Sequence, residues 1–531
     1  KPDRITELIE TKIIENGAAR CTIQVVQKCD DSVFRNNISL SSGSDLVEVQ
    51  CEFEWNNQRS LCKNVFSFNC SNNEAIFDLG LGAIRRGNAN EKIYEVPAQK
   101  WVALTDKSEE YGASVISDCK YGWDKFDDNT LRLTVVHTPL NNSRPQSMQS
   151  MLDLGLNRYG YAICGYKGTD FTRLQASARE FNAPMSAFVT DKHPGILGST
   201  YSFVKLSDEG IIIRAVKKAE HSNEIVVRVN EGINRSHEGI RLSLGSGIVS
   251  AREIYASEEH IAEMAVTDKC LVFDMKPYEV RSFALTLEAS SYSAEKIKQS
   301  PVILPYNIKA ITENKLHVKG ISSKGYSIPA EIIPDTITSG GVDFTINKGD
   351  FDSVLSDGQK FALNGEYNKI RFLCASLNGD KDFIFKLDDK AVKIRISDIE
   401  ERPFAWDLYS MKRTAKIKTD TLGWECTHTH SAKGDDYAHQ LFLFEYEIST
   451  DTAKEITLPK DKDLFILSAT EIKAPCECKC VTELYDRVKK RKFDFKIKGL
   501  KSKLNFAYRK VTSYVWKIDD IGRIMYVYFR H

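Results

Sequence analysis

The chain has no net charge and no long hydrophobic run. Its 531 residues include 73 basic and 73 acidic side chains, which cancel. This balance removes the positive field expected of a protein that binds nucleic acid along its whole length. No stretch approaches the roughly 18 apolar residues that cross a membrane, and the charged N-terminal segment does not resemble a signal peptide. We therefore expect neither nucleic acid nor a membrane as a partner.

The sequence also lacks a disulfide framework. Its 13 cysteines, an odd number, have no regular spacing, and several lie inside strand-like segments, such as Cys374 in KIRFLCASL. This usage favours a reducing compartment. We expect a cytoplasmic protein, with secretion as the alternative.

No complete catalytic or nucleotide-binding signature is present. The glycines of DLGLGAIRRG lack the G-x-G-x-x-G spacing and precede no helical pattern, so we interpret them as turn residues. The P-loop, the H-E-x-x-H zinc motif and the G-x-S-x-G nucleophile motif are absent as well. The residues by themselves point to no reaction.

Short strands dominate the sequence. Segments such as ARCTIQVVQ, DLVEVQCEFEW and QLFLFEYEI are rich in β-branched and aromatic residues and are separated by polar turn residues. The pattern predicts a mainly β fold of stacked β-sandwiches with few helices. One helix is expected in TDFTRLQASAREFNAP, where Phe171, Leu174, Ala178 and Phe181 recur at helical spacing and Pro184 follows.

Changes in composition suggest where domains begin and end. Small polar residues, lysines and two prolines collect in ASSYSAEKIKQSPVILPYN, as in a connector, and the C-terminal region turns cysteine-rich and then basic. The expected parts are a large β-sandwich at 1–190, a smaller one at 191–288, a linker at 289–325, a further β-sandwich at 326–475 and a basic tail at 476–531.

One loop ahead of a strand gathers groups that either pack a turn or face a sugar. In SDCKYGWDKFDDNTLRLTVVHTP, Asp118, Lys120, Tyr121 and Trp123 precede a segment, 130–135, in which apolar and polar residues alternate. The alternating segment is a strand. For the loop, a packed turn and a sugar-facing rim both remain open.

Two groups have spacing compatible with a metal ion. His428 and His430 lie two residues apart, so on a strand both imidazoles would share a face, and His439 could add a third ligand. Two histidines on the solvent face of a strand explain the pattern equally well. The C-x-C-x-C run at 476–480 lacks the C-x-x-C form of zinc sites and is interpreted as exposed thiols, with a soft metal ion as the alternative. The basic run at 487–503 is interpreted as a solvated segment, with an acidic partner as the alternative.

Several segments occur in a characteristic order: QKWVALTDKSEEYGASVISDCKYGWDK, TLRLTVVHTP, MLDLGLNRYGYAI and REFNAP. They resemble consecutive segments in the C-terminal half of glycoside hydrolase family 38 α-mannosidases. Upstream, IIENGAARCTIQVV and FDLGLGAIRRG are similar to the start of that family's large β-sandwich, and MKPYEVRSFALTLE resembles its closing strands. The resemblance covers about residues 1–288. It continues more loosely to SATEI, which is similar to an extra sandwich of bacterial members.

The resemblance implies an activity whose machinery lies elsewhere. Family members cleave α-mannosides with retention, using an aspartate nucleophile and a zinc ion held by an N-terminal α/β barrel. That zinc site begins with His-x-Asp, and none of the ten histidines here has Asp at that spacing. We therefore expect zinc in the complete enzyme, none bound by this chain, no catalytic residue within it, and no hydrolysis by the chain alone.

Two functions follow as hypotheses. The chain is either the C-terminal portion of an α-mannosidase, served by a barrel in cis or in trans, or a non-catalytic carbohydrate-binding or structural β-sandwich protein. In the first case the Asp118–Trp123 loop forms a rim of the mannoside pocket, because ligand sites often lie between domains. The chain also departs from the family at Asn157-Arg158, where His-Glu is common, and at Cys164-Gly165, which replaces Pro-His. Such changes suit a divergent bacterial branch or relaxed constraint.

Overall fold

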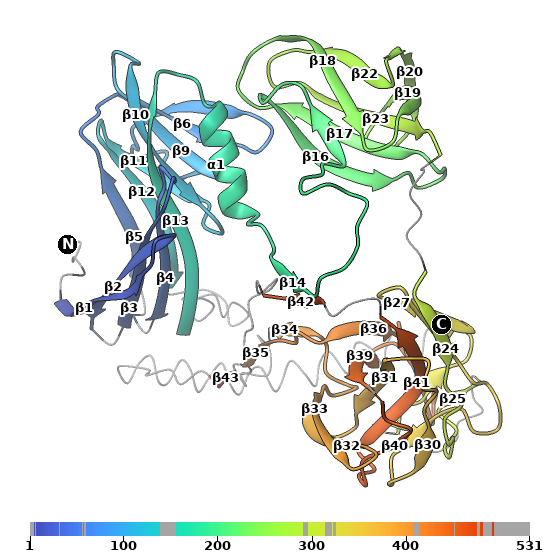
Figure 1. Cartoon of the computed structure of the whole chain (residues 1–531). Helices are drawn as coiled ribbons and strands as arrows, with labels where there is room; N and C mark the ends of the chain where they lie inside the picture. Colours follow the sequence, from blue (N-terminus) through green and yellow to red (C-terminus); the bar gives the residue numbers. More distant parts are fainter. Residues whose placement is uncertain are drawn as a thin grey trace, which may run out of the picture. The chain divides into compact units, whose positions relative to one another are not determined.

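A computed structural model gives the fold of this chain (Figure 1). It describes residues 5, 7–30, 32–55, 57, 60–138, 155–289, 296–313, 321, 325–406, 414–450, 452–474, 478–481 and 491–492. These form two compact units, of which the first contains two β-sandwiches and the second a third. The predicted mainly β fold is confirmed. Among the described helices, none has the length and apolar character that a membrane crossing requires.

The first sandwich packs a nine-stranded sheet against a four-stranded sheet, and all neighbouring strands are antiparallel. The nine strands, in order across the sheet, are β1 (Glu7–Asn16), β2 (Arg20–Cys29), β3 (Ser32–Ser41), β4 (Val47–Trp55), β13 (Gly155–Lys167), β10 (Tyr111–Ser117), β9 (Trp101–Thr105), β6 (Glu74–Asp78) and β7 (Ala83–Gly87). The four strands are β5 (Ser60–Ser67), β12 (Thr130–Thr138), β11 (Gly122–Asp127) and β8 (Val96–Pro97).

Both faces of the nine-stranded sheet are apolar where the sheet is covered. Val102 and Leu104 of β9 point into the core shared with the four-stranded sheet, whereas Trp101 and Ala103 point to the opposite face. That opposite face, here called the outer face, is covered by the single α-helix among the described residues, α1 (Thr172–Asn182) (Figure 1). Strands buried on both faces read as continuous apolar runs, and β9 is buried throughout.

The helix confirms the sequence-based expectation. Leu174 and Ala178 are buried against Trp101, and Phe171 stacks on the same indole with ring centroids 5.6 Å apart. The apolar residues at helical spacing thus form the face of the helix that packs on the sheet.

The second sandwich belongs to the same compact unit as the first. One sheet contains β16 (Ile211–Lys218), β17 (Ile225–Glu231), β23 (Val280–Leu287), β19 (Ile248–Ile254) and β20 (His260–Met264). The other contains β15 (Val204–Leu206), β18 (His237–Leu244), β22 (Cys270–Met275) and β21 (Val266–Thr267). A buried hydrogen bond joins the two sandwiches, because Gln175 Nε2 of α1 donates to the Gly232 carbonyl at 3.1 Å.

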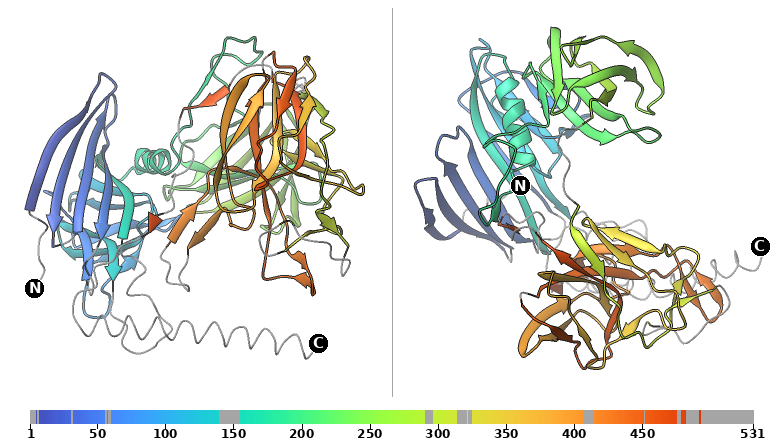
Figure 2. Two further views of the ribbon diagram at one scale, coloured as in Figure 1. Left: turned by 90° about the horizontal axis from the view of Figure 1, so that it is seen from below. Right: turned by 45° about the vertical axis from the view of Figure 1, so that its right-hand side comes forward.

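The third sandwich is built around one deeply buried sheet, seen from two further directions in Figure 2. This sheet contains β24 (Lys298–Pro301), β41 (Leu464–Lys473), β31 (Lys369–Ser376), β39 (Phe442–Ser449) and β36 (Thr421–Glu425), with β29 (Val354–Leu355) paired to β41. One face packs on a second sheet, made of β30 (Lys360–Ala362), β40 (Glu455–Thr457), β32 (Lys381–Leu387) and β33 (Lys390–Ile396).

Small strand pairs cover the other face of the central sheet. They are β25 (Ile311–Thr312) with β26 (Ile328–Pro329), β27 (Thr336–Ser339) with β28 (Val342–Thr345), and β37 (Thr429–Ser431) with β38 (Gly434–Asp436). Ile311, Ile328 and Phe344 of this layer pack against Phe465 and Leu467 of β41. Two cores therefore sandwich one sheet, which explains why β41 is buried at nine of its ten positions.

Two domain boundaries differ from the expectation. The predicted linker 289–325 is too long, because β24 pairs with β41 and Leu304 and Ile311 belong to the cores of the third sandwich. The predicted tail is not wholly separate either. Its strand β42 (Cys478–Cys480) pairs with β14 (Phe188–Thr190), and β43 (Arg491–Lys492) extends the pair β34 (Phe404–Trp406) and β35 (Thr414–Ile417).

Candidate functional site

The loop from Asp118 to Tyr121 joins β10 to β11 and is fixed to the neighbouring strand β13. Asp118 Oδ2 accepts a hydrogen bond from the Gly160 N–H at 2.8 Å, and the Asp118 N–H donates to the Gly160 carbonyl at 3.2 Å. A Cβ at position 160 would lie 2.6 Å from Gln50 Nε2 and 3.1 Å from Asp118 Oδ2, so any other residue there would force these side-chain ends to shift. Close approach of the carboxylate thus depends on the absence of a side chain.

The loop backbone forms a packed turn. Ser117 Oγ donates to the Lys120 carbonyl at 3.0 Å and accepts from the Lys120 N–H at 3.3 Å. Asn182 Nδ2, at the end of α1, donates to the Ser117 carbonyl at 3.2 Å. The other carboxylate oxygen of Asp118, Oδ1, is buried and has no hydrogen-bond partner among the described residues. The loop is therefore held on three sides, by its own turn, by β13 and by the helix.

Three of the four predicted rim residues, Asp118, Lys120 and Tyr121, are at least partly exposed. Tyr121 is 55% exposed, and Lys120 is partly exposed, with its Nζ 5.9 Å from the centroid of the Tyr159 ring. Trp123 is different, because it lies in β11, is fully buried and packs with Phe66 in the core. The rim prediction is wrong for Trp123, which is a core residue.

A row of amides leads across the outer face toward the loop, and the sequence reasoning did not identify it. Gln24, Asn37 and Gln50 are cross-strand neighbours on β2, β3 and β4, and Gln50 is paired with Gly160. Gln24 Nε2 donates to Asn37 Oδ1 at 2.9 Å. The alternating polar positions of these strands carried the signal, but the register that aligns them is visible only in the fold.

The inner face of the same strands carries an apolar row that reaches solvent. Ile13, Ile23 and Ile38 are cross-strand neighbours on β1, β2 and β3, and they are 67%, 44% and 37% exposed. The next residue in the row, Val49, is 4% exposed and belongs to the core. The core-facing side of the sheet thus continues beyond the part that is buried, and contiguous exposed apolar groups of this kind mark interaction surfaces.

A cleft of about 950 Å³ lies beside α1, between β13 and the start of the second sandwich. Its walls carry charges of both signs, including Asp45, Glu180, Arg173 and Arg179. Arg173 and Asp45 already approach each other at 3.5 Å. The cleft offers mixed, mutually compensating charge, and we assign it no ligand.

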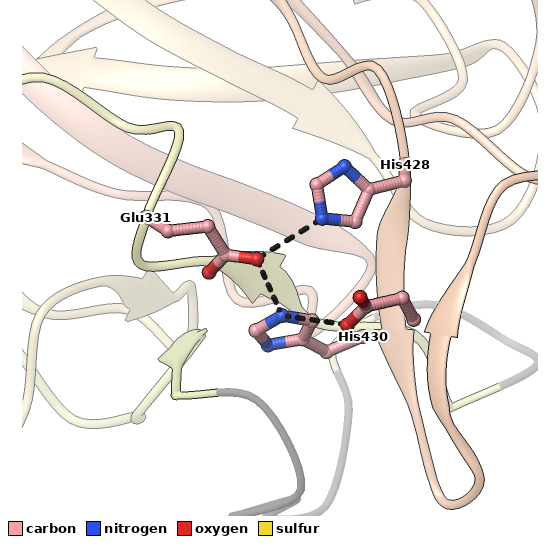
Figure 3. Close-up of side chains that lie close together, drawn as sticks. Glu331, His428 and His430 are labelled. Atoms are coloured by element: carbon pink, nitrogen blue, oxygen red, sulfur yellow. Dashed lines mark hydrogen bonds and ion pairs between the residues drawn. The ribbon is translucent and has the colours of Figure 1, made fainter.

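The two predicted metal-site histidines lie in the third sandwich and are brought together there. His428 immediately precedes β37 and His430 lies within it, and they are 6% and 1% exposed. The alternative, in which both occupy the solvent face of a strand, is therefore wrong. Figure 3 shows both imidazoles directed at the carboxylate of Glu331. His439, expected as a third ligand, instead contacts Asp436 and Tyr326.

The remaining candidates fall largely outside the described residues. Cys476 is one of these, and only the backbone of β42 is described for the other two cysteines of the C-x-C-x-C run. The basic run at 487–503 is likewise described only for the backbone of β43.

Comparison with known proteins relates each sandwich to a domain family. Residues 2–144 match the glycosyl hydrolases family 38 C-terminal domain, and residues 210–283 match the glycosyl hydrolases family 38 C-terminal beta sandwich domain. Residues 298–475 match a different family, the AziU2-like beta-sandwich domain. The third sandwich thus has its own domain family.

Similar proteins include Alpha-mannosidase G of Dictyostelium discoideum, which is 27% identical over 237 residues, or 41% of this chain and 20% of that protein. A solved α-mannosidase from Enterococcus faecalis V583 is 13% identical, with a TM-score of 0.45 over 52% of this chain and 35% of that one. A family 38 protein from Enterococcus faecalis gives 14% identity and the same TM-score over 52% and 36%. The chain spans about a fifth of the curated relative and about a third of these structures. Its first two sandwiches are C-terminal domains of glycoside hydrolase family 38.

Proposed function

We propose that this chain is the non-catalytic C-terminal portion of a retaining α-mannosidase, which acts on α-mannosides together with a catalytic barrel supplied in cis or in trans. The observation that carries the proposal is the succession of two family 38 C-terminal domains, at 2–144 and 210–283. The similarity to a protein named Alpha-mannosidase G supports the substrate class.

The zinc of that reaction does not fit the family 38 sandwiches. Its first ligands form a His-x-Asp pair, and no histidine of the sequence has Asp at that spacing. The one group of metal-ligating side chains among the described residues lies in the AziU2-like sandwich, outside the family 38 matches. We therefore assign the zinc and the nucleophile to the barrel and derive no hydrolytic step from this chain.

The exposed apolar row of β1, β2 and β3 is the surface that we assign to the barrel. Ile13, Ile23 and Ile38 together extend the core-facing side of the sheet into solvent. Burying each large aliphatic side chain is worth roughly 1.5–3 kcal/mol, so a docked domain would gain substantially from covering them. Burial of this apolar row would therefore stabilise the association with the barrel.

The loop at Asp118–Tyr121 is the element that we assign to the pocket rim. Tyr121 offers an aromatic face to the C–H surface of a sugar ring, and the Lys120 ammonium offers hydrogen bonds to hydroxyl groups. Asp118 does not contact the sugar in this scheme. It holds the loop through Gly160, so that the other two side chains keep their positions.

A mannosidase assay with matched surface variants tests the proposal. The chain alone, with or without added zinc, should not hydrolyse an aryl α-mannoside, whereas the protein that also contains the family 38 barrel should. With the barrel added in trans, Ile13→Asp should weaken association at least tenfold. Val65→Asp is the matched control, because Val65 is 61% exposed on β5 of the opposite sheet and should leave association unchanged. Turnover by the chain alone that a mutation within it abolishes would overturn the assignment.

The exposed amide row favours a second candidate, a carbohydrate-binding protein without hydrolysis. Asn37 and Gln50 present amide groups on an open face, and amides are common partners of sugar hydroxyls. This candidate requires the chain alone to bind α-mannosides by calorimetry and to lose binding in Gln50→Ala. Binding that appears only with the barrel present excludes it.

A further inference from the structure

Four metal-ligating side chains of the third sandwich converge from two segments that are distant in sequence. Glu331 lies in the turn after β26, His428 and His430 lie at β37, and Asp435 lies in β38, directly across the hairpin from His430. Two backbone hydrogen bonds between Ser327 and His430, at 3.0 and 3.1 Å, tie the segments together. The convergence is thus fixed by the backbone.

The spacing of the four side chains matches a small coordination sphere. The Nε2 atoms of His428 and His430 lie 3.0 and 3.1 Å from Glu331 Oε1, and His430 Nε2 lies 3.5 Å from Asp435 Oδ1. All four ligand atoms lie within 4.8 Å of one another. In a tetrahedral zinc site with bonds of about 2.0–2.2 Å, neighbouring ligand atoms are roughly 3.3–3.6 Å apart. The separations of 3.0, 3.1 and 3.5 Å are close to these values, and any pair near the 4.8 Å limit would have to shorten by about 1 Å around an ion.

The second nitrogen of each imidazole is positioned as in a metal-bound histidine. His430 Nδ1 lies 3.1 Å from Thr312 Oγ1, and His428 Nδ1 lies 3.1 Å from Thr427 Oγ1. If each Nδ1–H donates to its threonine oxygen, each Nε2 presents a lone pair toward the centre of the group. Metal-bound histidines almost always have such an outer partner, which fixes the ring and the tautomer.

Electrostatics favours a cation in the centre. The carboxylates of Glu331 and Asp435 converge on two imidazoles that are almost fully buried. Two like charges within 4.8 Å repel each other in a partly buried setting unless something positive separates them. A divalent ion would neutralise both carboxylates and replace the repulsion with attraction.

We propose that His428, His430, Glu331 and Asp435 bind a divalent transition-metal ion, with zinc as the best match to two imidazoles and two carboxylates. Four protein ligands make a closed site, which is typical of structural rather than catalytic zinc. The ion joins the Glu331 turn to a hairpin 97 residues further along the chain and thereby fastens the small strands over the central sheet. This site belongs to the AziU2-like domain, and it is separate from the zinc assigned to the mannosidase barrel.

Metal titration of the full chain, freed of metal by a chelator, tests the site. We expect one equivalent of Zn²⁺ to bind in competition with a chromogenic chelator and to raise the melting temperature. Co²⁺ should give the visible absorption of a tetrahedral ion. His428→Ala should abolish these signals, and Glu331→Gln, which keeps the shape of a half-exposed side chain, should weaken binding at least tenfold.

The control variant is His439→Ala, a histidine that closely follows the same hairpin but contacts Asp436 and Tyr326 instead. It should bind Zn²⁺ as the unaltered chain does. The proposal fails if the unaltered chain binds no zinc at micromolar concentration. It also fails if His428→Ala and Glu331→Gln bind as tightly as the unaltered chain, because the metal would then lie elsewhere. Should His428→Ala not fold, the Glu331→Gln result decides.

Discussion

Asp118 and Gly160 exchange two hydrogen bonds, one from the Gly160 N–H to the carboxylate at 2.8 Å and one from the Asp118 N–H to the Gly160 carbonyl at 3.2 Å. The pair joins the loop after β10 to the middle of β13. The carboxylate therefore acts first on the position of the loop, and any effect on a ligand passes through Lys120 and Tyr121.

Replacing Asp118 should therefore destabilise the fold. In Asp118→Ala the buried Gly160 N–H loses its acceptor, which costs about 1–3 kcal/mol in the free energy of unfolding. Asp118→Asn retains an oxygen acceptor and should preserve most of the stability. Denaturant titration of the full chain, followed at the transition in which the first unit unfolds, measures the difference in the free energy of unfolding. If both variants are as stable as the unaltered chain, Asp118 does not position the loop, and a direct contact with the sugar at the pocket rim becomes the better explanation.

Tyr121 should behave in the opposite way. Its side chain is 55% exposed, so Tyr121→Ala should change the free energy of unfolding by no more than about 0.5 kcal/mol. In the enzyme that we propose, assembled with its barrel, turnover of an α-mannoside per folded molecule should fall more than tenfold, which corresponds to about 1.4 kcal/mol of transition-state stabilisation. Tyr111→Ala serves as the control, because Tyr111 is 50% exposed on β10 but lies at the opposite end of that strand. A similar loss of turnover in both variants would contradict a specific role for Tyr121.

The ion pair between Arg252 and Glu224 should make the second sandwich sensitive to acid. The guanidinium binds both carboxylate oxygens, at 2.9 and 2.7 Å, and this hydrogen bonding lowers the pKa of Glu224 below its ordinary value of 4.5. A depressed folded-state pKa adds stability above the unfolded pKa, and that stability is lost as the pH falls through the folded pKa.

At pH 7 we therefore expect Glu224→Gln to be less stable than the unaltered chain by about 1 kcal/mol, with the difference shrinking below about pH 4.5. Urea unfolding at a series of pH values measures it. Glu238→Gln, at an exposed position of β18, should show no comparable loss at pH 7. A difference for Glu224→Gln that stays constant down to pH 3 would argue against the ion pair as its source.

Alkylation should separate the cysteines of the first sandwich by burial. Burial raises the pKa of Cys51 to about 12 and that of Cys62 to about 11, so at pH 8 only roughly one Cys51 thiol in ten thousand is the reactive thiolate. Cys21 is exposed on β2. Iodoacetamide should therefore label Cys21 in the native chain and label Cys51 and Cys62 only after unfolding in guanidinium, as read by peptide mass spectrometry. Native labelling of Cys51 at the rate of Cys21 would show that this part of the sheet opens.

Sequence periodicity identified the elements whose faces differ strongly in polarity. The helix at 172–182 was predictable because Leu174 and Ala178 lie on one face and pack against the sheet. The strands were predictable because β-branched and aromatic residues alternate or run between turn residues. The third sandwich's central strand β41 was also visible as an apolar run, since it is buried on both faces.

The sequence-based predictions were wrong or incomplete where tertiary contacts, rather than the local sequence, determine the environment of a residue. Trp123 and Tyr121 are both aromatic residues beside Gly122, but β11 begins between them, so one enters the core and the other stays in solvent. The segment around Pro301 resembled a linker because proline is disfavoured inside sheets, yet edge strands tolerate it and β24 is an edge strand. The pairing of Glu331 with two histidines 97 and 99 residues away has no local signal at all.

The pairing of β24 with β41 also determines how the third sandwich can be exchanged. Lys298, at the start of its first strand, is the cross-strand partner of Lys473, at the end of β41. The two ends of residues 298–473 therefore lie next to each other. A segment with adjacent ends can be replaced by a short linker, or inserted into a loop of another protein, without distorting the flanking structure. Residues 298–473, which lack only the β42 and β43 pairings described above, are thus the transferable part of the third sandwich, and the ion that we assign to it would travel with them.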